Sequence, residues 1–300
     1  MPTHRTPLTR KQKLLAGLDQ QSNLGLEIGA LCRPFLLRDE GPVIYADHAD
    51  TQTLRDKYKD DPNVDVDAIV EVDAVWGANT LLQALGDRHV DYVVASHVIE
   101  HVPDLIAWLS ELRSVLNPGG EVRLIVPDKR FTFDYFREET QIAAALHSNL
   151  IHARVPQPQI LIDYCLNVAK VDCASAWKAP LDRFAVERHH DLQTALGVAQ
   201  DCLQNGAYHD VHCWVFSPRS FARLFREMAE FGLIDLACGN FFDTERNDME
   251  FFVSLQPSDD KSRTVDSWRW MEAQARDDAP GRPFWKTRRA LRFMAQRSST

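Results

Sequence analysis

The 300-residue sequence lacks the cysteine pattern and the basic surplus that several protein classes require. It holds six cysteines, but they are scattered and form no CxxC pair, which indicates reduced, buried thiols rather than disulfides or a zinc site. The cysteines are Cys32, Cys165, Cys173, Cys202, Cys213 and Cys238. Acidic residues outnumber basic ones by 43 to 34, giving a formal net charge of −9. A broad basic face for binding phosphates is therefore not expected, and we exclude nucleic acid as a partner.

Long apolar runs are missing as well. The first residues, MPTHRTPLTRKQK, do not contain the apolar stretch of a signal peptide, and no other stretch is long enough to cross a bilayer. We therefore expect a cytoplasmic protein without a transmembrane segment. The hydrophobic content of 45% is enough for a full core, in one large domain or two small ones.

What the sequence does contain is a strand, helix and strand pattern between Val90 and Asp128. Residues 90–95 form a short β-branched run that predicts a buried strand, and Pro103 suits the first position of the following helix. The tetrapeptide NPGG predicts the end of that helix, and a second buried strand follows over residues 122–126. Such a unit places its ligand edge at the strand ends, near residues 96–101 and 128–130.

Three earlier strands are predicted to end at residues suited to binding a ligand. Residues 24–29 end in Gly29, residues 43–46 are followed by Asp47, and residues 68–72 are followed by Asp73 and Trp76. A carboxylate at a strand end can accept both hydroxyls of a ribose, although a lone Asp there is more often a helix cap. Trp76 could stack on a base or simply pack in the core.

These motifs carry a family resemblance. EHVPD, a helix, NPGG and a strand ending in VPD resemble the fourth and fifth strands of class I S-adenosylmethionine (SAM)-dependent methyltransferases, and the resemblance covers residues 24–128 and 217–255. It implies a Rossmann-like, seven-stranded, mostly parallel sheet with helices on both faces and an antiparallel last strand inserted between its neighbours. The implied cofactor is SAM, with S-adenosylhomocysteine as its product.

The resemblance also implies which residues bind the cofactor. Glu27 and Gly29 match the family motif ExGxGxG, but Leu31 and Arg33 stand where its second and third glycines are expected. The missing glycines argue more strongly against a nicotinamide cofactor than against SAM, because the GxGxxG motif of nicotinamide enzymes needs its glycines beside a pyrophosphate. Asp47 is implied at the ribose and Asp73 at the adenine amino group. The full set implied for the cofactor is Glu27, Gly29, Ala30, Asp47, Asp73, Trp76, Ser96 and His97.

Outside the resemblance the pattern becomes helical. We expect an N-terminal helix within residues 1–22, a SAM-binding core over 23–128 and a mostly helical acceptor-site insertion over 129–216. Residues 217–256 are expected to complete the core with a helix and the last two strands, and residues 257–300 form a basic helical tail. That tail suggests a neighbouring domain or an acidic partner, although a solvated helix explains it equally.

Three segments, ASHVIEHVPD, VPDKRFTFD and DVHCWVFSP, are similar to a bacterial group associated with surface-polysaccharide gene clusters. This narrower resemblance implies O-methylation of a sugar hydroxyl, with a glycan or a sugar nucleotide as the acceptor. Two other functions stay open: a non-catalytic SAM-fold scaffold module in a glycan-assembly protein, and a nicotinamide-dependent oxidoreductase. The single glycine of the first loop and the lack of a Tyr-x-x-x-Lys pair argue against the oxidoreductase.

A hydroxyl acceptor requires a base, because its proton must leave as the new bond forms. We predict His101 or His212 as that base, with Asp128 and Asp210 as carboxylates that orient it. Alternate residues of an extended segment share one face, so Asp210 and His212 can converge while His209 turns away. Imidazole and carboxylate together can also bind a divalent metal. A metal is possible on these residues, but the spacing does not predict one.

Overall fold

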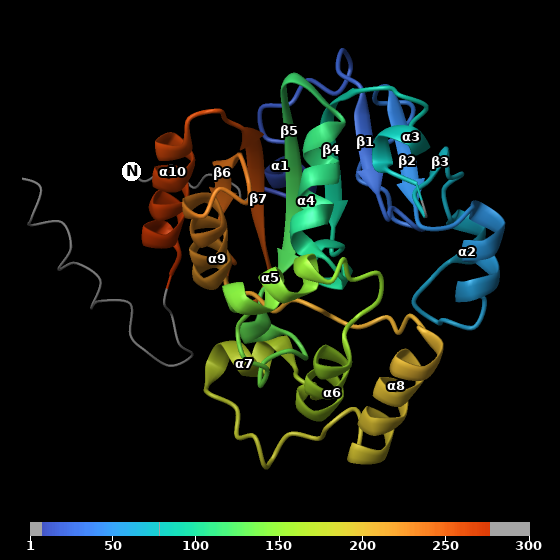
Figure 1. Cartoon of the computed structure of the whole chain (residues 1–300), viewed down its shortest axis with the longest axis vertical. Coiled ribbons are helices and arrows are strands. Elements are labelled where there is room, and N and C mark those ends of the chain that lie inside the picture. Colours follow the sequence, from blue (N-terminus) through green and yellow to red (C-terminus); the bar gives the residue numbers. More distant parts are fainter. Residues whose placement is uncertain (1–7, 78, 277–300) are drawn as a thin grey trace, which may run out of the picture.

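The computed structural model describes residues 8–77 and 79–276, and its centre is a seven-stranded sheet (Figure 1). The strands lie in the order β3-β2-β1-β4-β5-β7-β6. Their bounds are β1 Gly25–Ile28, β2 Val43–Asp47, β3 Ala74–Val75, β4 Val90–Ser96, β5 Leu116–Pro127, β6 Leu236–Phe242 and β7 Glu250–Pro257. Strands β1 to β5 pair in parallel, whereas β7 is antiparallel to β5 and to β6, between which it is inserted. The predicted Rossmann-like fold is confirmed.

Ten α-helices and three short 3-10 turns connect these strands in the part of the chain that the structure describes. The helices around the sheet are α1 Arg10–Leu14, α2 Thr51–Tyr58, α3 Leu81–Ala84, α4 Leu105–Ser114, α9 Pro218–Glu230 and α10 Lys261–Gln274. Four more, α5 Ile142–Leu150, α6 Pro158–Asn167, α7 Cys173–Lys178 and α8 Leu192–Asn205, lie between β5 and α9. The 3-10 turns are η1 Val66–Ala68, η2 Ile99–His101 and η3 Lys129–Phe131.

Alternate strand residues face opposite sides of the sheet, as the period of a strand requires. Leu26, Val93 and Ala95 belong to the larger core, which includes buried residues of α4, α9 and α10. Tyr92 and Val94 belong to a second, smaller core on the other face, where α1 packs. Both faces are thus buried, which fits the near-continuous apolar strands of the sequence.

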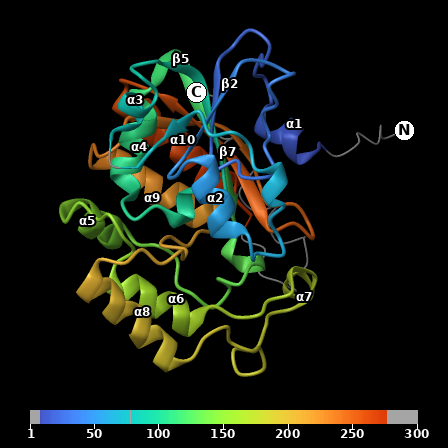
Figure 2. The same cartoon turned by 90° about the vertical axis from the view of Figure 1, so that its right-hand side faces the viewer.

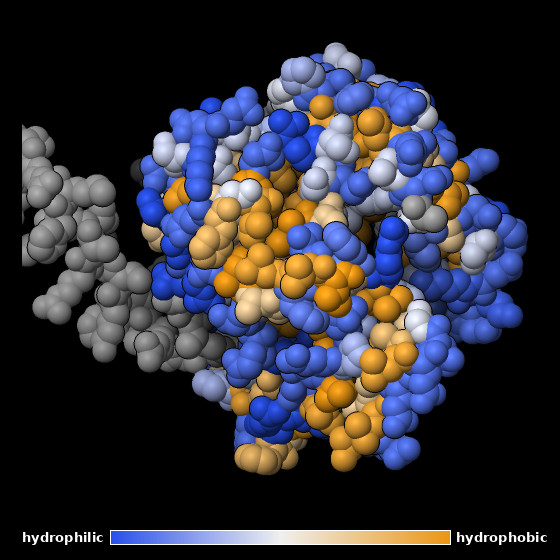
Figure 3. Space-filling model, viewed as in Figure 1, coloured by the Kyte–Doolittle hydropathy of each residue, from blue (hydrophilic) through white to orange (hydrophobic). Residues whose placement is uncertain are grey.

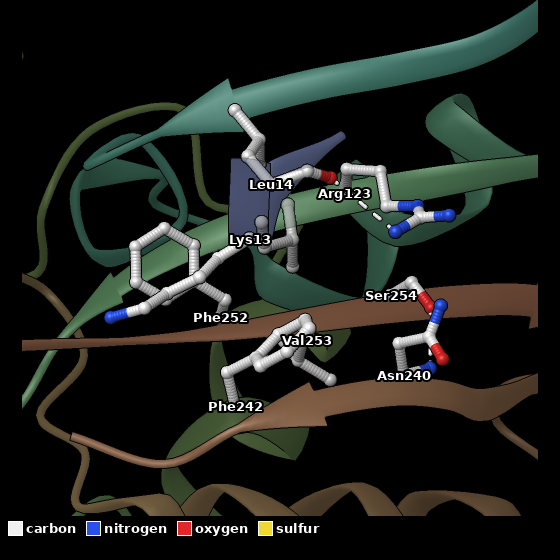
Figure 4. A pocket seen from close by; sticks show the side chains of 9 residues that line it. Lys13, Leu14, Arg123, Asn240, Phe242, Phe252, Val253 and Ser254 are labelled. Atoms are coloured by element: carbon white, nitrogen blue, oxygen red, sulfur yellow. Dashed lines mark hydrogen bonds between the residues drawn. The ribbon is translucent and has the colours of Figure 1, made fainter. Parts of the chain in front are cut away.

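The first helix packs on one face of the sheet, over β5 and β7. Figure 4 shows Lys13 and Leu14 of α1 beside Arg123 of β5 and Phe252 of β7, where they line a narrow gap. The Arg123 guanidinium donates to the carbonyl oxygens of Leu14 and Ala16, so it ties the end of the helix to the sheet. This gap lies over the face of the sheet and not at the strand ends where ligands bind.

Helices α5 to α8 lie together beyond the carboxyl ends of the parallel strands, as both views show (Figures 1 and 2). The space-filling view shows apolar side chains gathered over α5 and over the helices below it (Figure 3). Exposed apolar residues of α5 and α8 include Leu146, Leu150, Leu192 and Leu203. The insertion expected over residues 129–216 thus contains four helices in the described chain, and the last of them, α8, begins only at Leu192.

Two strand predictions were wrong in position. The third strand is not residues 68–72 but Ala74–Val75, because η1 precedes it and the Val70 amide bonds to the Leu31 carbonyl instead of to a strand. The NPGG tetrapeptide does not separate helix from strand, since β5 begins already at Leu116. The helix expected within residues 1–22 is found at Arg10–Leu14, and a capping box at Thr9 begins it.

No helix among the described residues is long and apolar enough to span a membrane. All six cysteines are free. The cluster of arginines in the predicted basic tail lies in residues 280–300, outside the described part of the chain.

Candidate functional site

The turn after β1 is held by Glu27. Its buried carboxylate accepts backbone hydrogen bonds from Phe35, at 2.9 Å, and from Leu36, at 2.8 Å. Burial raises the pKa of Glu27 to about 7, although these two bonds and the charge of Lys11 oppose the shift. Glu27 therefore fixes the loop that follows the strand, and any effect it has on a cofactor passes through that loop.

The loop itself keeps a glycine-like backbone where glycines are missing. Gly29 has a φ of +69°, and a side chain there would meet Val98 at 3.1 Å. Leu31, which replaces the second glycine of the family motif, also has a positive φ, of 45°. The left-handed conformation is thus retained without the residue that favours it.

Asp47 ends β2 and points one carboxylate oxygen toward its neighbour. Its Oδ1 accepts the His48 amide at 2.7 Å and lies 2.6 Å from the His48 ring Nδ1. Among the described residues, Oδ2 has no hydrogen-bond partner. The tip of β2 therefore presents a free acceptor oxygen at the edge of the sheet where parallel strands bind ligands.

Asp73 is not at a strand tip. It precedes β3, and its carboxylate accepts the Tyr45 amide at 2.8 Å and pairs with Arg38 at the same distance. The geometric reason for directing it at an adenine is thereby removed. Trp76 does follow β3, is partly buried and packs against the larger core, and its amide donates to the Asp47 carbonyl.

The tip of β4 is strained and highly charged. Ser96 ends the strand, and the next residue, His97, has a φ of +54°. The Nε2 of His97 lies 2.9 Å from Glu250 of β7, which Arg10 of α1 also contacts. Burial alone would lower the pKa of His97, but its contacts with Glu100 and Glu250 raise it to about 9. The N-terminal helix is linked in this way to the fourth strand.

Glu100 lies in the η2 turn and is fully buried, with 0% of its surface exposed. Neither carboxylate oxygen has a hydrogen bond of good geometry from any residue in 8–77 or 79–276. The nearest basic groups are Nδ1 of His97 at 3.5 Å and Nε2 of His212 at 3.9 Å from Oε1. Burial favours the protonated acid, but these imidazoles and His101 outweigh it and lower the pKa of Glu100.

The two histidines predicted as bases lie together above Glu100. The rings of His101 and His212 are 4.7 Å apart and meet edge to face. Asp210 Oδ1 lies 2.8 Å from His101 Nδ1, so the extended segment does bring Asp210 and His212 to one place. Burial lowers the pKa of His101, but Asp210 and Glu100 raise it on balance. The His101 side chain is 31% exposed and that of His212 only 8%.

The carboxylate that orients His212 was missed by the sequence analysis. It is Asp134, whose Oδ2 lies 2.5 Å from His212 Nδ1. Arg137 donates to Asp134 and to the His212 carbonyl, at 2.9 and 2.8 Å, and also pairs with Asp163. Burial would raise the pKa of Asp134, but His212 and Arg137 lower it. The sequence did offer one indication of Asp134, because it is the last residue of the motif VPDKRFTFD.

Asp128, predicted as an orienting carboxylate, contacts neither histidine. Its buried side chain binds the Arg130 guanidinium, the Arg130 amide and the Thr244 hydroxyl. It therefore secures the end of β5 and the start of the insertion. The carboxylates beside the two histidines are Asp134 and Asp210 instead.

The remaining histidines of this region lie outside the cluster. His209 turns away, as predicted, and bonds to Asp201 of α8 at 2.9 Å. His189 and His190 are exposed and lie on the segment before α8. A hollow of about 500 Å³ is found elsewhere, between α4, α9 and the start of α10. Its charged lining residues are Arg113, Asp235, Asp259 and Lys261, and among the described residues no histidine or cysteine lines it, so we place the site at the strand ends.

These strand ends fit the cofactor that the resemblance implies. SAM carries a ribose, and the free Oδ2 of Asp47 at the tip of β2 is a suitable acceptor for its hydroxyls. The positive φ of Gly29 lets backbone approach a ligand closely at the tip of β1. Ala30 and Ser96 flank the same edge, at the ends of β1 and β4.

Comparison with known proteins gives one family match, to a methyltransferase domain, over residues 24–233. No curated protein matches the sequence. Among solved structures, the chain is similar to DhpI in complex with SAH, at 14% identity and a TM-score of 0.35, covering 79% of this chain and 78% of that one. The chain is also similar to a putative S-adenosylmethionine-dependent methyltransferase from Listeria monocytogenes, at 11% identity and a TM-score of 0.41, covering 83% of this chain and 96% of that one. A structure described as putative Zn-dependent alcohol dehydrogenases from Rhodobacter sphaeroides is similar at 12% identity and a TM-score of 0.45, covering 84% of this chain and 91% of that one.

Proposed function

Because this chain belongs to the methyltransferase-domain family, we propose that it transfers a methyl group to a hydroxyl of a sugar. The chain is a SAM-dependent methyltransferase, and SAM supplies a methyl group bound to a positively charged sulfur. The acceptor class goes beyond the family. It is supported by the groups gathered at the carboxyl edge of the sheet and by the narrower resemblance of three sequence segments.

On the cofactor side, we propose that Asp47 and the loop after β1 hold SAM. Asp47 binds the ribose through its free oxygen, and Glu27 keeps the loop in place through the Phe35 and Leu36 amides. An in-line methyl transfer depends mainly on aligning acceptor, methyl and sulfur, so a fixed loop contributes by orientation. Trp76 beside the tip of β2 is our candidate for contact with the adenine.

The observation that carries the hydroxyl acceptor is the pair of imidazoles next to a buried carboxylate. A sugar hydroxyl is too weak an acid to ionise at neutral pH, so its proton must be removed as the carbon–oxygen bond forms. In the simplest form of this step, the more exposed His101 takes the proton, and Asp210 at 2.8 Å stabilises the resulting imidazolium. His212, held by Asp134, completes the wall of the site.

The surroundings of His212 suit a sugar ring. Phe133 lies 4.6 Å from the His212 ring and Tyr164 lies 6.4 Å from it, and both are partly exposed. Sugars carry C–H faces as well as hydroxyls, so a site that combines aromatic rings with a few fixed polar groups matches them. We propose that residues 129–216 form the acceptor side of the site, with a glycan or a sugar nucleotide as the acceptor.

The six free cysteines support a reducing compartment, and we propose the cytoplasm. The arginine-rich tail beyond residue 280 remains our candidate for contact with a neighbouring domain or an acidic partner.

The test is transfer of labelled methyl from SAM to a panel of sugars and sugar nucleotides. We expect turnover to fall roughly 100-fold or more in His101→Ala, with SAM affinity unchanged. His209→Ala is the matched control, since His209 lies outside the cluster, bonds to Asp201 and should leave turnover near wild type. Mass spectrometry of a ligand that co-purifies with the chain would identify the cofactor independently. SAM binding without transfer to any sugar would support a scaffold module instead.

A further inference from the structure

The buried Glu100 has the surroundings of a metal ligand. A carboxylate that is shielded from water and has no hydrogen bonds of good geometry is costly unless another charge compensates it. Glu100 is 0% exposed, and neither of its carboxylate oxygens has a hydrogen bond of good geometry from the described residues. The His97 imidazole at 3.5 Å compensates part of the Glu100 charge, but the carboxylate oxygens lack hydrogen bonds of good geometry and so stay available to a further ligand.

Two imidazoles complete a possible coordination set. One ligand atom from each of Glu100, His101 and His212 can be chosen so that all three lie within 4.8 Å of one another. Two ligands bound to one ion at 2.0–2.2 Å are roughly 3–3.6 Å apart. The 3.9 Å between His212 Nε2 and Glu100 Oε1 thus needs a contraction of only a few tenths of an ångström. The half-exposed ring of His101 has more room to move.

The orientation of His212 also suits this role. Metal-binding histidines usually give their other ring nitrogen to a carboxylate, which fixes the ring and its tautomer. Asp134 makes this contact with His212 Nδ1 at 2.5 Å, and Arg137 holds Asp134 from behind. Nε2 is thereby left facing Glu100.

We propose that Glu100, His101 and His212 bind one divalent transition-metal ion. Two imidazoles and one carboxylate suit Zn²⁺, Fe²⁺, Mn²⁺ or Co²⁺ and not Ca²⁺ or Mg²⁺, which prefer all-oxygen sites. Three protein ligands leave coordination positions open for a substrate.

The use of this ion rests on the proposed function, whereas its binding does not. A sugar hydroxyl on the ion becomes a stronger acid, so the ion replaces a free imidazole in activating it. The hydroxyl proton would leave to solvent on the exposed His101 side of the site. The carbon–oxygen bond then forms as the carbon–sulfur bond breaks, and S-adenosylhomocysteine leaves as a neutral thioether.

The first experiment measures binding without any acceptor. The full chain is freed of metal with a chelator, dialysed and titrated with Co²⁺, with visible absorption and calorimetry as readouts and Zn²⁺ as a competitor. We expect one saturable site in the wild type. Glu100→Gln and His101→Gln should weaken it by at least about 100-fold, beyond the roughly 10- to 100-fold cost of losing an outer partner of a ligand.

His209→Gln is the control for adventitious binding, because it removes an imidazole nearby but outside the cluster. It should bind Co²⁺ as the wild type does. The inference is overturned if the wild type has no saturable site, if Glu100→Gln binds equally well, or if His209→Gln is weakened to the same degree. Circular dichroism and melting temperature confirm that each variant is folded. His101→Gln, on a half-exposed residue, tests the site even if Glu100→Gln does not fold.

A second experiment separates this inference from the proposed function. Methyl transfer is measured on chelator-treated chain before and after Zn²⁺ or Mn²⁺ is restored. We expect turnover to fall at least tenfold without metal and to recover with it. Full turnover of the metal-free chain would leave the sugar methyltransferase intact and overturn the role of the ion. Metal binding without any methyl transfer would leave the metal site intact and overturn the proposed sugar methyltransferase function.

Discussion

The two sides of the candidate site are assembled from contacts of very different range. On the cofactor side, Glu27 bonds to a backbone amide eight residues along the chain, and Asp47 bonds to its immediate neighbour. On the acceptor side, His212 and Asp134 are 78 residues apart, and Arg137 and His212 are 75 apart. The first side is thus shaped by the local chain, whereas the second forms only when the sheet and the insertion fold together.

The difference also concerns charge. Asp134 and Arg137 are almost fully buried, and each depends on its partners for compensation. Buried ion pairs of this kind contribute little in net terms when complete, but they are costly to break. We therefore expect the acceptor side to be the more sensitive to single substitutions, and the following predictions test that expectation.

The largest effect is expected for Asp134→Ala. It leaves the Arg137 guanidinium buried without one of its two carboxylates, which typically costs about 3–5 kcal/mol of unfolding free energy. The control is Asp163→Ala, which removes the other partner of Arg137. Because the Asp163 side chain is 39% exposed, this control should cost at most about 1 kcal/mol. Urea unfolding measures both, and equal losses would contradict the contrast.

Glu27 gives a pH-dependent effect on the cofactor side. Its pKa is raised from 4.5 to about 7 by burial, so the folded chain binds this proton more tightly than the unfolded chain does. The protonated Glu27 therefore adds to the free energy of unfolding below about pH 4.5, and this contribution is lost as the pH rises to about 7. The pKa difference corresponds to about 3 kcal/mol of unfolding free energy.

Glu27→Gln cannot titrate, so denaturant unfolding between pH 4.5 and 7.5 should show a flatter profile for this variant than for the wild type. The control is Glu40→Gln, on a side chain that is 40% exposed, and it should keep the wild-type profile. A Glu27→Gln profile parallel to that of the wild type would refute the assignment.

A smaller loss, in binding rather than in folding, is expected for Asp47→Ala. A charge-assisted hydrogen bond to the ribose contributes about 1.5–3 kcal/mol, so SAM affinity should fall roughly 10- to 100-fold. Asp73→Asn is the control, because Asp73 precedes β3 and is engaged with Arg38 and Tyr45. Calorimetric titration that finds unchanged SAM affinity in Asp47→Ala would rule out the ribose contact.

The same contrast in range explains what the sequence could predict. Six of the seven strands lie near the predicted residues, because short apolar runs ending in turn residues are local signals. The third strand was misplaced because Ile69, Val70 and Val72 form an apolar run that does not pair, whereas the strand that pairs has only two residues. Within the insertion, residues 179–191 are not helical, and a turn at residues 183–185 and an isolated bridge between Ala169 and Arg188 lie there instead.

For the site, residues within a strand tip could be predicted, whereas their partners could not. Asp210 and His212 were expected to converge because they share one face of an extended segment, and both lie beside His101. The assignment of Asp128 as their partner failed, because the position of Asp134 depends on how the insertion folds back over the sheet. No local pattern determines that path.

The smallest effect that we predict concerns Leu31, where the chain retains a glycine-like backbone without a glycine. A left-handed conformation costs a non-glycine residue about 1–2 kcal/mol, and Leu31 has a φ of 45°. Leu31→Gly removes that strain. The added glycine also gives the unfolded chain more freedom, which lowers the free energy of unfolding by about 0.5–1 kcal/mol. The net result should be a stabilisation below about 1 kcal/mol, seen as a higher urea midpoint.

Ala30→Gly is the matched control, because Ala30 is not among the residues with a positive φ. It should lose about 0.5–1 kcal/mol through the same change in the unfolded chain, with no strain to relieve. Opposite signs for these neighbouring substitutions would show that the first loop keeps the backbone of the glycine motif. If Leu31→Gly destabilises the chain as much as Ala30→Gly does, Leu31 is not strained, and the loop has taken a path of its own.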